Sequence, residues 1–428
     1  MGGVSFFVIF VLSNIMDMSI QNKRKIINDP VFGFIHIPSG LLYDLIQHPY
    51  FQRLNRIKQL GLSYLVYPGA QHTRLQHSIG AMYLTVEAVK HLQFQGNEIT
   101  DAEADGVYAA VLLHDIGHAP FSLIMEHAFA EGMSHEEITM LMMRKINAEM
   151  DGKLDLALKI FENKYPKRFL HTLVSGQLDM DRMDYLRRDS FYTGVSEGTI
   201  GSARIIKMLD VADDKIVLEA KGIYSIEQFL IARRLMYWQV YFHKTSVAAE
   251  RMLINIVRRA KELAGQGVEL FASPALRYFL YNKVTKHDFL TKEETLANYA
   301  LLDDSDLLCA IKVWMSHDDK VLSMLCDMFT NRKLFKIKES DVPFDDDVVS
   351  EQIARYMNRL GISEHEAAYF TYRGSFASDT YTKGEDNINI LYRDGSTKDI
   401  SEASDMLNIS VLSKQVRKHY FCYMKDEE

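Results

Sequence analysis

Hydrophobic residues along most of the chain recur at intervals of three and four, which is the spacing of one face of an α-helix. Ser134 and Glu137 have the spacing of a capping box, so we expect a helix to begin there and to run through Ile146. The other helices predicted in the first half of the chain span residues 41–59, 79–92 and 101–114, two shorter segments within 153–175, and a segment that begins near 177.

A longer helical stretch follows in the middle of the chain. Ser225 and Gln228 form a second capping-box pattern, and the 39 residues that end at Ala264 contain neither Gly nor Pro. A single helix of that length is unusual in a globular protein. We therefore expect either a kink near Thr245 or a helix that lies at an oligomer interface.

Short strands are predicted on both sides of the helical region. Residues 26–39 alternate apolar residues with turn formers, which predicts a β-hairpin, and residues 213–224 predict a strand or a second hairpin. The segments DNINILYRDG and VRKHYFCYM near the C-terminus are also typical of strands. The expected fold is therefore mainly α, a helical bundle with short β-hairpins and a small C-terminal α+β appendage.

The pattern also divides the chain into regions. The acidic segment ESDVPFDDD marks a boundary or an exposed loop near residues 339–350. The expected organisation is an N-terminal extension over residues 1–25, a helical core over 26–265, a helical extension over 266–340 and an α+β region over 341–428. The extension contains VSFFVIFVL, which is too short to span a bilayer and has no Lys or Arg before it. We interpret it as a tail added by an upstream start codon; the alternative is a membrane or export signal.

Composition narrows the class of protein. The chain has 428 residues, of which 47% are hydrophobic and 25% charged, and these are ordinary values for a soluble globular protein. Its formal net charge of -8 argues against general binding to nucleic acid or to anionic membranes. Three cysteines lie far apart and form no CxxC pair, so no zinc ribbon or redox pair is indicated and a reducing cytoplasm is expected.

One apolar segment carries ionisable residues that need a partner. VYAAVLLHDIGHAPFS places His114 and Asp115 directly after an apolar run, where burying charge is costly unless something compensates. A divalent metal would compensate, and His77 in RLQHSIG could add a second imidazole. The candidates for a fourth ligand are the carboxylates of LDMDRMDYLRRDS, namely Asp179, Asp181 and Asp184. Two imidazoles and two carboxylates suit Mn²⁺, Fe²⁺, Ni²⁺, Zn²⁺ or Mg²⁺, with positions left for water and a phosphate oxygen.

This ordered set of residues resembles the HD superfamily of metal-dependent phosphohydrolases. The segments FQRLNRIKQLGLSYLVYPGAQHTRLQHSIG, LLHDIGHAPFS, LDMDRMDYLRRDS and YFHK are similar to its deoxynucleoside-triphosphate triphosphohydrolase branch, and the resemblance covers residues 26–265. It implies one divalent metal ion per site, held by His77, His114, Asp115 and Asp181. It leaves Asp179 and Asp184 to cap a helix or to pair with Arg182 or Arg188.

Hydrolysis also needs a group that moves a proton. His118 is four residues beyond His114 and would face the same cavity if the helix persists that far, so it is the leading acid, base or phosphate-binding group. The resemblance implies that Glu126 and His135 support it, although a surface position beside the capping box would also explain His135. Many relatives have another His where this chain has Leu123, so we expect proton delivery to differ from theirs.

The resemblance also implies a set of substrate contacts. The predicted phosphate-binding cations are Arg74, Arg182, Arg233 and Lys244. The predicted contacts to the sugar are Gln59 and Asp189 at the 3′-hydroxyl, Leu60 and Tyr185 beside the 2′ carbon, and Tyr241 on the deoxyribose. Core packing would explain Leu60, Tyr185 and Tyr241 equally well. Where some relatives read a guanine-nucleotide activator, this chain has Gln47 and Asn55, so the same activation is not expected.

Three hypotheses for the function follow. The leading one is a cytoplasmic, homo-oligomeric hydrolase that converts a deoxynucleoside triphosphate (dNTP) to deoxynucleoside and triphosphate. The second keeps the metal site but changes the substrate to a nucleoside monophosphate or another phosphoester. The third is a nucleotide-binding regulatory protein with a vestigial site, and the presence of all four predicted ligands argues against it. Neither nucleic acid nor a membrane is expected as a partner.

Overall fold

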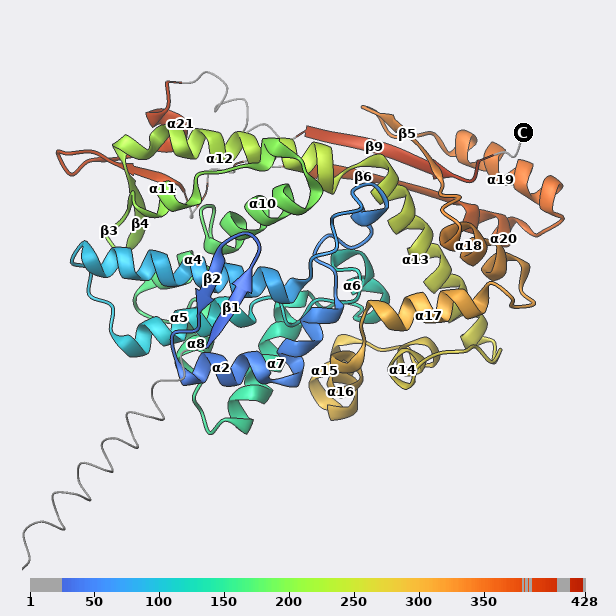
Figure 1. The fold of residues 1–428 in the computed structure, drawn as a ribbon. Coiled ribbons are helices and arrows are strands. Elements are labelled where there is room, and N and C mark those ends of the chain that lie inside the picture. The colour runs from blue at the N-terminus through green and yellow to red at the C-terminus, as the bar shows by residue number, and fades with distance from the viewer. Residues whose placement is uncertain (1–24, 379–380, 382–383, 385–386, 406–415, 426–428) are drawn as a thin grey trace, which may run out of the picture.

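The computed structural model describes residues 25–378, 381, 384, 387–405 and 416–425. These residues form a mainly helical fold with three small, separate sheets, as predicted (Figure 1). The apolar run VSFFVIFVL lies outside the described residues. None of the helices in the described ranges combines the length and the apolarity that a membrane crossing requires.

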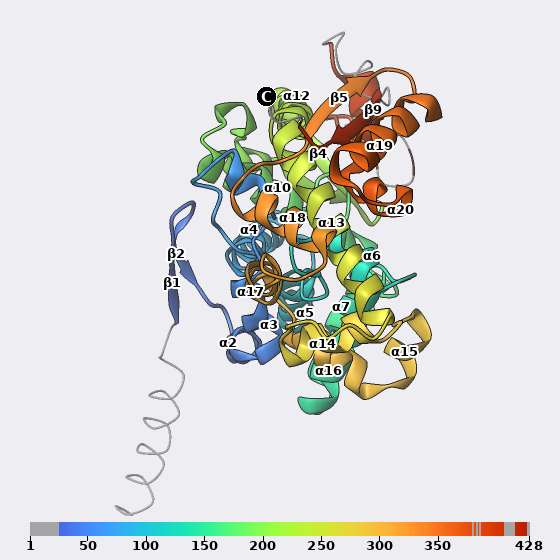
Figure 2. The same cartoon turned by 90° about the vertical axis from the view of Figure 1, so that its right-hand side faces the viewer.

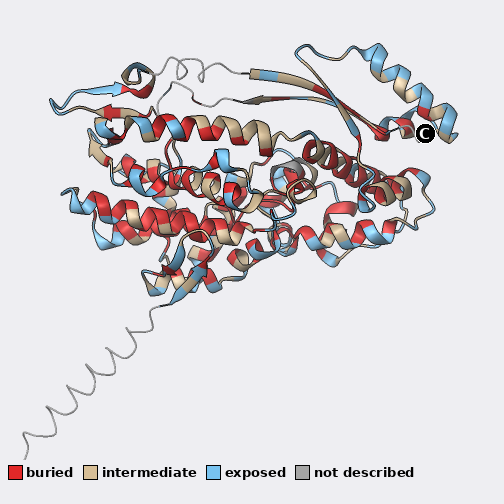
Figure 3. Cartoon of the chain, turned by 45° about the horizontal axis from the view of Figure 1, so that its top comes forward, coloured by how far each residue is buried: buried red, intermediate tan, exposed pale blue. Residues whose placement is uncertain are grey.

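Three helices form the centre of the fold: α4 (Arg74–Phe94), α5 (Asp101–Leu113) and α10 (Met180–Thr193). α4 packs against both of the others, and α5 is buried over most of its length (Figure 3). Because α5 is enclosed, it needs no polar face. The apolar periodicity predicts that the α4 helix begins at Ile79. α4 begins earlier, at Arg74, because Thr73 and Gln76 form a capping box ahead of the apolar pattern.

The local signals of the first half are mostly confirmed. The N-terminal hairpin consists of β1 (Ile26–Asp29) and β2 (Gly33–His36), which pair antiparallel. Ser134 and Glu137 form the predicted capping box of α7. The surrounding helices are α2 (Gly40–Gln47), α3 (Pro49–Gln52), α6 (Leu123–Phe129), α7 (His135–Glu149), α8 (Asp155–Phe161) and α9 (Arg168–Val174).

The long stretch without Gly or Pro is divided into two helices. α12 (Ile223–Met236) runs into a π-helical turn, η5 (Tyr237–Tyr241), and α13 (Lys244–Gly265) starts after it. His243 is extended, and its Nδ1 accepts a hydrogen bond from the backbone N–H of Thr245, so the predicted break is confirmed. The prediction that Ser225 caps this helix is wrong. The 3₁₀ turn η4 (Ala220–Gly222) leads directly into α12, which begins two residues before Ser225.

The C-terminal half adds helices at both ends of α13 (Figure 2). α13 packs against α18, α14 and α6, so it is an internal helix of the fold. The helices of this half, besides α12 and α13, are α14 (Pro274–Tyr281), α15 (Lys286–Thr291), α16 (Glu293–Leu301), α17 (Asp304–Trp314), α18 (Lys320–Thr330), α19 (Asp346–Leu360), α20 (Glu364–Ala367) and α21 (Ile400–Ala403). The short helix α11 (Ser202–Ile206) precedes them.

Two sheets contain the C-terminal strands, as the expected fold class with its C-terminal α+β appendage requires. One sheet has the order β3-β4-β7-β8, with strands β3 (Leu209–Ala212), β4 (Lys215–Glu219), β7 (Asn389–Leu391) and β8 (Thr397–Asp399). β7 pairs parallel to β4, so the end of the chain returns to the central region. The other sheet has the order β5-β9-β6, with strands β5 (Lys336–Ser340), β9 (Val416–Tyr423) and β6 (Thr371–Ser378).

Candidate active site

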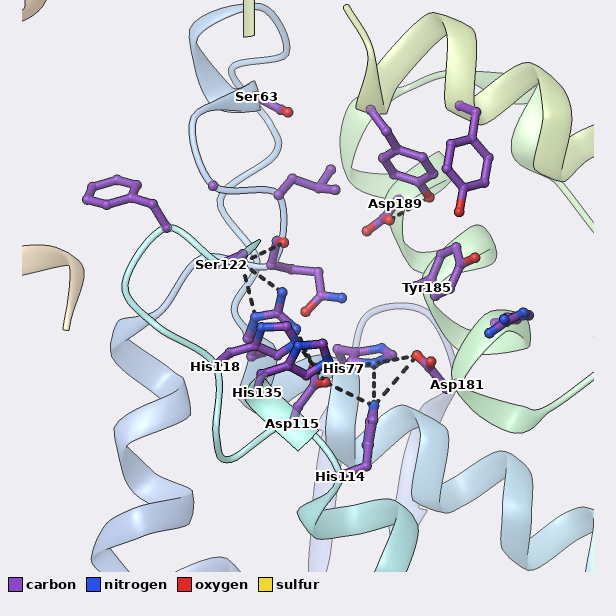
Figure 4. A pocket seen from close by; sticks show the side chains of 18 of the residues that line it. Ser63, His77, His114, Asp115, His118, Ser122, His135, Asp181, Tyr185 and Asp189 are labelled. Atoms are coloured by element: carbon purple, nitrogen blue, oxygen red, sulfur yellow. Dashed lines mark hydrogen bonds and ion pairs between the residues drawn. The ribbon is translucent and has the colours of Figure 1, made fainter. Parts of the chain in front are cut away.

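A cavity of about 700 Å³ lies where α4, α10, η5 and the segment after α5 meet (Figure 4). Side chains from widely separated parts of the sequence share this space. The predicted site residues in its lining are Gln59, Leu60, Arg74, His77, His114, Asp115, His118, His135, Asp181, Arg182, Tyr185, Asp189 and Tyr241. Arg233 and Lys244 are absent from this lining, and Glu126 lies behind His118 and His135.

Two imidazoles and two carboxylates converge on one point of the cavity wall. His77 Nε2 lies 3.0 Å from Asp181 Oδ1 and 3.3 Å from His114 Nε2. His114 Nε2 lies 3.2 Å from Asp115 Oδ1 and 3.6 Å from Asp181 Oδ1. Neighbouring ligand atoms around one octahedral ion with bonds of about 2.1 Å are about 3 Å apart. The four side chains therefore fit one divalent metal ion.

Hydrogen bonds behind the two imidazoles fix which nitrogen faces the cavity. His77 Nδ1 lies 2.7 Å from Asp184 Oδ2, and His114 Nδ1 lies 2.6 Å from the carbonyl oxygen of Val111. Both oxygens only accept hydrogen bonds, so each Nδ1 carries the proton and donates it. Each Nε2 then keeps a lone pair for a metal ion, which is the arrangement that metal-binding histidines need.

The carboxylate behind His77 belongs to a buried ionic chain. Arg188 donates from Nε to Asp184 Oδ2 over 2.9 Å and from Nη1 to Asp29 Oδ2 over 2.7 Å. Gly80 on α4 makes room for this pair, because a Cβ there would lie 2.0 Å from Asp184 Oδ1. The predicted pairing of Asp184 with Arg188 is observed, and Asp184 also orients His77.

Electrostatics at the four-ligand cluster favour a cation. Burial lowers the pKa of His77, but the hydrogen-bonded Asp181 and Asp184 carboxylates outweigh it and raise the pKa to about 10. Burial raises the pKa of Asp181, yet the two imidazoles bring it well below its usual range. The carboxylates thus remain ionised and attract positive charge, which a divalent ion at the Nε2 atoms would supply.

The helix that carries His114 ends earlier than predicted. α5 stops at Leu113, one residue before the predicted end, and the chain reaches His118 through turns, so the condition that the helix persists as far as His118 is not met. The cause is close packing against the start of α7, because a Cβ on Gly117 would lie 2.2 Å from the carbonyl oxygen of His135. The turn still brings His118 into the cavity, beside His135.

His118, Glu126 and His135 form a compact group next to the four-ligand cluster. The two imidazole rings stack with centroids 3.9 Å apart, and Glu126 Oε1 lies 3.1 Å from His118 Nδ1 and 2.9 Å from His135 Nδ1. His118 Nε2 is 3.3 Å from Asp115 Oδ1. Burial raises the pKa of Glu126, but the two imidazoles lower it to about 2, so its carboxylate is ionised at neutral pH.

Two of the four predicted phosphate-binding cations face the cavity. Arg74 donates from Nη1 to Asp115 Oδ2 over 2.5 Å and from Nη2 to Ser122 Oγ over 2.7 Å. Arg182 contacts Asp179 Oδ2 at 3.1 Å, and its Nε is buried without a hydrogen-bond partner in the described chain. Asp179 also caps α10, as predicted, by accepting from the backbone N–H of Arg182.

The other two cations point elsewhere. The Arg233 guanidinium is buried against Gln177, to which it donates over 3.1 Å. Lys244 is largely exposed and pairs with Glu339 of β5 at 3.1 Å, because the break after η5 turns the start of α13 toward that strand. Of the four predicted cations, only Arg74 and Arg182 thus lie in the lining of the cavity as described.

Asp189 and Tyr185 lie across the cavity from His114 and Asp115 (Figure 4), and the other predicted sugar-binding residues, Gln59, Leu60 and Tyr241, also line it. Tyr241 donates from its hydroxyl to Asp189 Oδ2 over 2.9 Å, and His72 Nε2 lies 2.7 Å from Asp189 Oδ1. The amide oxygen of Gln59 is buried without a hydrogen-bond partner among the described residues. Asp189 is therefore held on both oxygens.

A residue outside the predicted core fixes the loop that carries the site. Asp304, at the start of α17, accepts from the backbone N–H of Phe121 over 2.7 Å and of Lys58 over 2.9 Å. Phe121 and Ser122 have φ values of 53° and 66°, a region that costs most L-residues about 1–3 kcal/mol. The buried Arg53 donates to the backbone carbonyl oxygen of His118 over 2.8 Å and holds the same loop.

Four contributors to the site carry no motif of their own. Asp184 and His72 lie within the motif segments, but their spacing does not show that they support His77 and Asp189. Arg53 and Asp304 act through long-range backbone contacts, and no local pattern marks such contacts. None of these four residues is in the described lining of the cavity; they position the residues that are.

The helical fold with its His, His-Asp and Asp cluster defines a class of metal-dependent phosphohydrolase. Residues 74–189 match the HD domain, and residues 200–271 match the HD associated region. Each match covers elements that build the cavity, since the first runs from α4 through Asp189 and the second includes η5 and α13. The chain belongs to the HD-domain family.

Two similar proteins match nearly all of the chain, and a third matches about half of it. The uncharacterized protein YwfO of Bacillus subtilis is 33% identical over 95% of this chain and 93% of its own length. The solved structure of a phosphohydrolase from Bacteroides thetaiotaomicron is 61% identical, with a TM-score of 0.91 over 94% of this chain and 100% of that one. The deoxynucleoside triphosphate triphosphohydrolase SAMHD1 homolog of Dictyostelium discoideum is 31% identical over 58% of this chain and 52% of that protein.

Proposed function

We propose that this protein hydrolyses deoxynucleoside triphosphates to deoxynucleoside and triphosphate. One observation carries the proposal: a single cavity holds the four-ligand cluster, two arginines and a hydrogen-bonded Asp189–Tyr241 pair suited to a sugar hydroxyl. The similarity to the deoxynucleoside triphosphate triphosphohydrolase homolog of Dictyostelium discoideum supports the same substrate class.

In this proposal His77, His114, Asp115 and Asp181 hold the divalent metal ion. A bound ion would act as a Lewis acid toward the phosphoryl charge and make water more acidic. Arg74 and Arg182 bind phosphate oxygens from the sides. Arg74 already spans Asp115 and Ser122, so it can reach a phosphate without leaving its support.

The reaction adds water across the bond between the α-phosphorus and the 5′ oxygen. The oxygen of water becomes bonded to phosphorus, and a proton goes to the departing 5′ oxygen. His118 is the proposed group that moves this proton, since it faces the cavity next to Asp115. Glu126 lies behind His118 and His135 and holds both imidazoles in place through its ionised carboxylate.

The sugar end supplies selectivity for deoxyribose. Asp189, fixed by His72 and Tyr241, accepts a hydrogen bond from the 3′-hydroxyl, and the Gln59 amide adds a second polar contact. Leu60 and Tyr185 line the same part of the cavity and leave an apolar wall beside the 2′ carbon. A ribose 2′-hydroxyl would be buried there without a partner, and this disfavours ribonucleotides.

The test is the product released from each substrate class. The purified protein is incubated with Mn²⁺, Fe²⁺, Ni²⁺, Zn²⁺ or Mg²⁺ and with dNTPs, ribonucleoside triphosphates or deoxynucleoside monophosphates. We expect inorganic triphosphate and deoxynucleoside in equal amounts, and His118→Gln should lose this activity. His171→Gln is the matched control, because His171 contacts the carbonyl oxygen of Ile160 outside the cavity.

Two outcomes would favour the other hypotheses. Cleavage of monophosphates without any inorganic triphosphate would assign the site to a phosphomonoesterase. A biological effect that survives the double substitution His114→Ala, Asp115→Ala would assign it to a nucleotide-binding regulator. Either result refutes the proposed triphosphohydrolase.

We also propose that the protein is a cytoplasmic homo-oligomer. All three cysteines, Cys309, Cys326 and Cys422, are unpaired in the structure, which suits a reducing compartment. Sedimentation of the purified chain measures its oligomeric state, and a monomer at all concentrations would contradict the second part of this proposal.

A further inference from the structure

The contact between Tyr241 and Asp189 depends on an unusual turn. η5 is π-helical, and the backbone N–H of Phe242 donates over 2.8 Å to the carbonyl oxygen of Tyr237, five residues earlier. Such turns are rare, and each contains one residue more than the α-helical path would. Because each residue of an α-helix turns the chain by about 100°, a return to α-helical spacing would rotate Tyr241 away from Asp189. Their hydrogen bond therefore requires η5 to keep its π-helical form.

The end of this turn has a carbonyl group that the next turn of helix does not satisfy. The chain becomes extended at His243, and the N–H of His243 donates to the carbonyl oxygen of Val240. The last carbonyl groups of a helix lack backbone donors. At Gln239 the hydroxyl of Tyr67 supplies the donor, over 2.5 Å to the carbonyl oxygen. The Tyr67 ring also lies edge-on to the His243 ring, with centroids 6.0 Å apart, so it contacts both sides of the break.

The loop that carries Tyr67 also supports Asp189. This loop comes just before α4, and near its end His72 Nε2 lies 2.7 Å from Asp189 Oδ1. Between these two residues the loop passes close to α10, because a Cβ on Gly69 would lie 2.6 Å from the carbonyl oxygen of Tyr192. One end of the loop is thus fixed to α10 and the other end to η5, so the loop sets the position of one element relative to the other.

We propose that Tyr67 is a positioning residue for the sugar end of the site: its hydrogen bond keeps η5 π-helical and so holds Tyr241 against Asp189. The inference rests on the proposed function, because it takes the Asp189–Tyr241 pair as the group that binds the 3′-hydroxyl. Tyr67 is absent from the described lining of the cavity, so it acts through the turn. Without its hydroxyl, the partly buried Gln239 carbonyl loses its donor, and the π-helical form of the turn loses its support.

The effect of Tyr67 should be confined to the sugar. The four proposed metal ligands lie on α4, on α10 and directly after α5, and none of them lies on η5. A shift of Tyr241 therefore weakens binding of the 3′-hydroxyl without moving the metal ligands. We expect KM to rise while kcat changes little, because the lost contact is made equally in the ground state and in the transition state.

The first test is Tyr67→Phe, which keeps the ring and removes only the hydroxyl. We expect KM for dTTP to rise by about tenfold, which corresponds to the loss of one buried hydrogen bond. For 2′,3′-dideoxythymidine triphosphate, which lacks the 3′-hydroxyl, KM should be the same in wild type and variant. Tyr278→Phe is the matched control, because the Tyr278 hydroxyl contacts Thr295 outside the cavity. An unchanged KM for dTTP, or an equal rise for both substrates, would overturn the proposal.

A double-mutant cycle shows whether Tyr67 acts through Tyr241. If it does, Tyr67→Phe combined with Tyr241→Phe should raise KM for dTTP no further than Tyr241→Phe alone. Two independent contributions would multiply instead, and that result would contradict the positioning role. A general loss of stability would also multiply with the effect of Tyr241→Phe, so the cycle separates positioning from a purely structural effect.

Binding measurements separate this inference from the proposed function. Calorimetric titration with thymidine and with 2′,3′-dideoxythymidine reports recognition of the 3′-hydroxyl without hydrolysis. A preference for thymidine that Tyr67→Phe reduces by about tenfold, in a protein that releases no triphosphate, would support the positioning role and refute the proposed reaction. Release of triphosphate together with an identical thymidine preference in wild type and Tyr67→Phe would overturn the positioning role and leave the reaction in place.

Discussion

Replacement of Asp304 by Asn should separate stability from activity. Asp304 accepts backbone N–H groups from Phe121 and Lys58 and thereby holds the strained loop beside the candidate active site. An Asn side chain has the same shape, but its amide offers one acceptor oxygen where the carboxylate offers two. One of the two backbone N–H groups then loses its partner, and the loop that carries His118 becomes less well fixed.

The size of the effect follows from the pKa of Asp304. Burial raises this pKa from the usual 3.8 to about 6, although the N–H groups of Lys58 and Phe121 and the Lys58 charge oppose the rise and the Asp303 carboxylate adds to it. A difference of about two pKa units makes the ionised form cost about 3 kcal/mol of folding free energy at pH 7. Asn removes this cost and loses one buried hydrogen bond, worth about 1–3 kcal/mol. We therefore expect unchanged or slightly higher stability at pH 7.

The pH dependence has a definite sign. A carboxylate with a raised folded-state pKa binds more protons in the folded than in the unfolded chain between about pH 4 and pH 6. Its contribution to stability is fully present below pH 4 and is lost as the pH rises through 6. The melting temperature of Asp304→Asn relative to wild type should therefore increase from pH 4 to pH 7.

Thermal unfolding across this pH range and kcat/KM for dNTPs at pH 7 are the two assays. We expect kcat/KM to fall by about tenfold to a hundredfold, as misplacement of a catalytic group does. Asp306→Asn is the control, because Asp306 completes the capping box of α17 and touches no part of the loop. If Asp304→Asn lowers the melting temperature by as much at pH 7 as at pH 4, or leaves kcat/KM unchanged, the reasoning is refuted.

Two further substitutions test the supports of the metal cluster and of the sugar site. Asp184→Asn removes the carboxylate that orients His77, so metal affinity measured by competition with a chelator should fall by about 10–100-fold; unchanged affinity would contradict this role. Tyr241→Phe removes the hydroxyl that donates to Asp189, and kcat/KM for dNTPs should fall by about tenfold with little change in melting temperature. Tyr281→Phe, which alters a tyrosine outside the cavity, should leave kcat/KM unchanged, and equal losses in both variants would speak against the assignment.

Local signals predicted much of the helical fold because they act within a few residues. Ser134 caps α7 where its spacing with Glu137 requires, and the stretch without Gly or Pro breaks before Thr245. The capping pattern at Ser225 does not start a helix, and the reason for this is also local. The preceding 3₁₀ turn had already set helical backbone angles, so a capping residue two positions later had no helix to start.

The candidate site was predicted in part. Its four proposed ligands come from motifs whose residues are close in sequence or in a fixed order, and the structure places them within contact of one another. Arg233 and Lys244 show the limit of that approach. Whether a cation faces a cavity depends on what its helix packs against. Lys244 forms an ion pair with Glu339 of β5, and sequence periodicity cannot place that strand relative to α13.

The two halves of the cavity differ in how their residues are brought together, and this bears on what each half can do. The metal cluster and His118 lie on α4, α10 and the turns after α5, which pack directly and hold the reacting groups rigidly. The far end combines α13 with Phe376, a residue of β6 more than a hundred positions further along the chain. A change in the C-terminal sheet can therefore reshape this end of the cavity while the four-ligand cluster keeps its geometry. In such an arrangement the helical centre fixes the positions of the candidate reacting groups, and the shape of the far end of the cavity depends on how the end of the chain folds back.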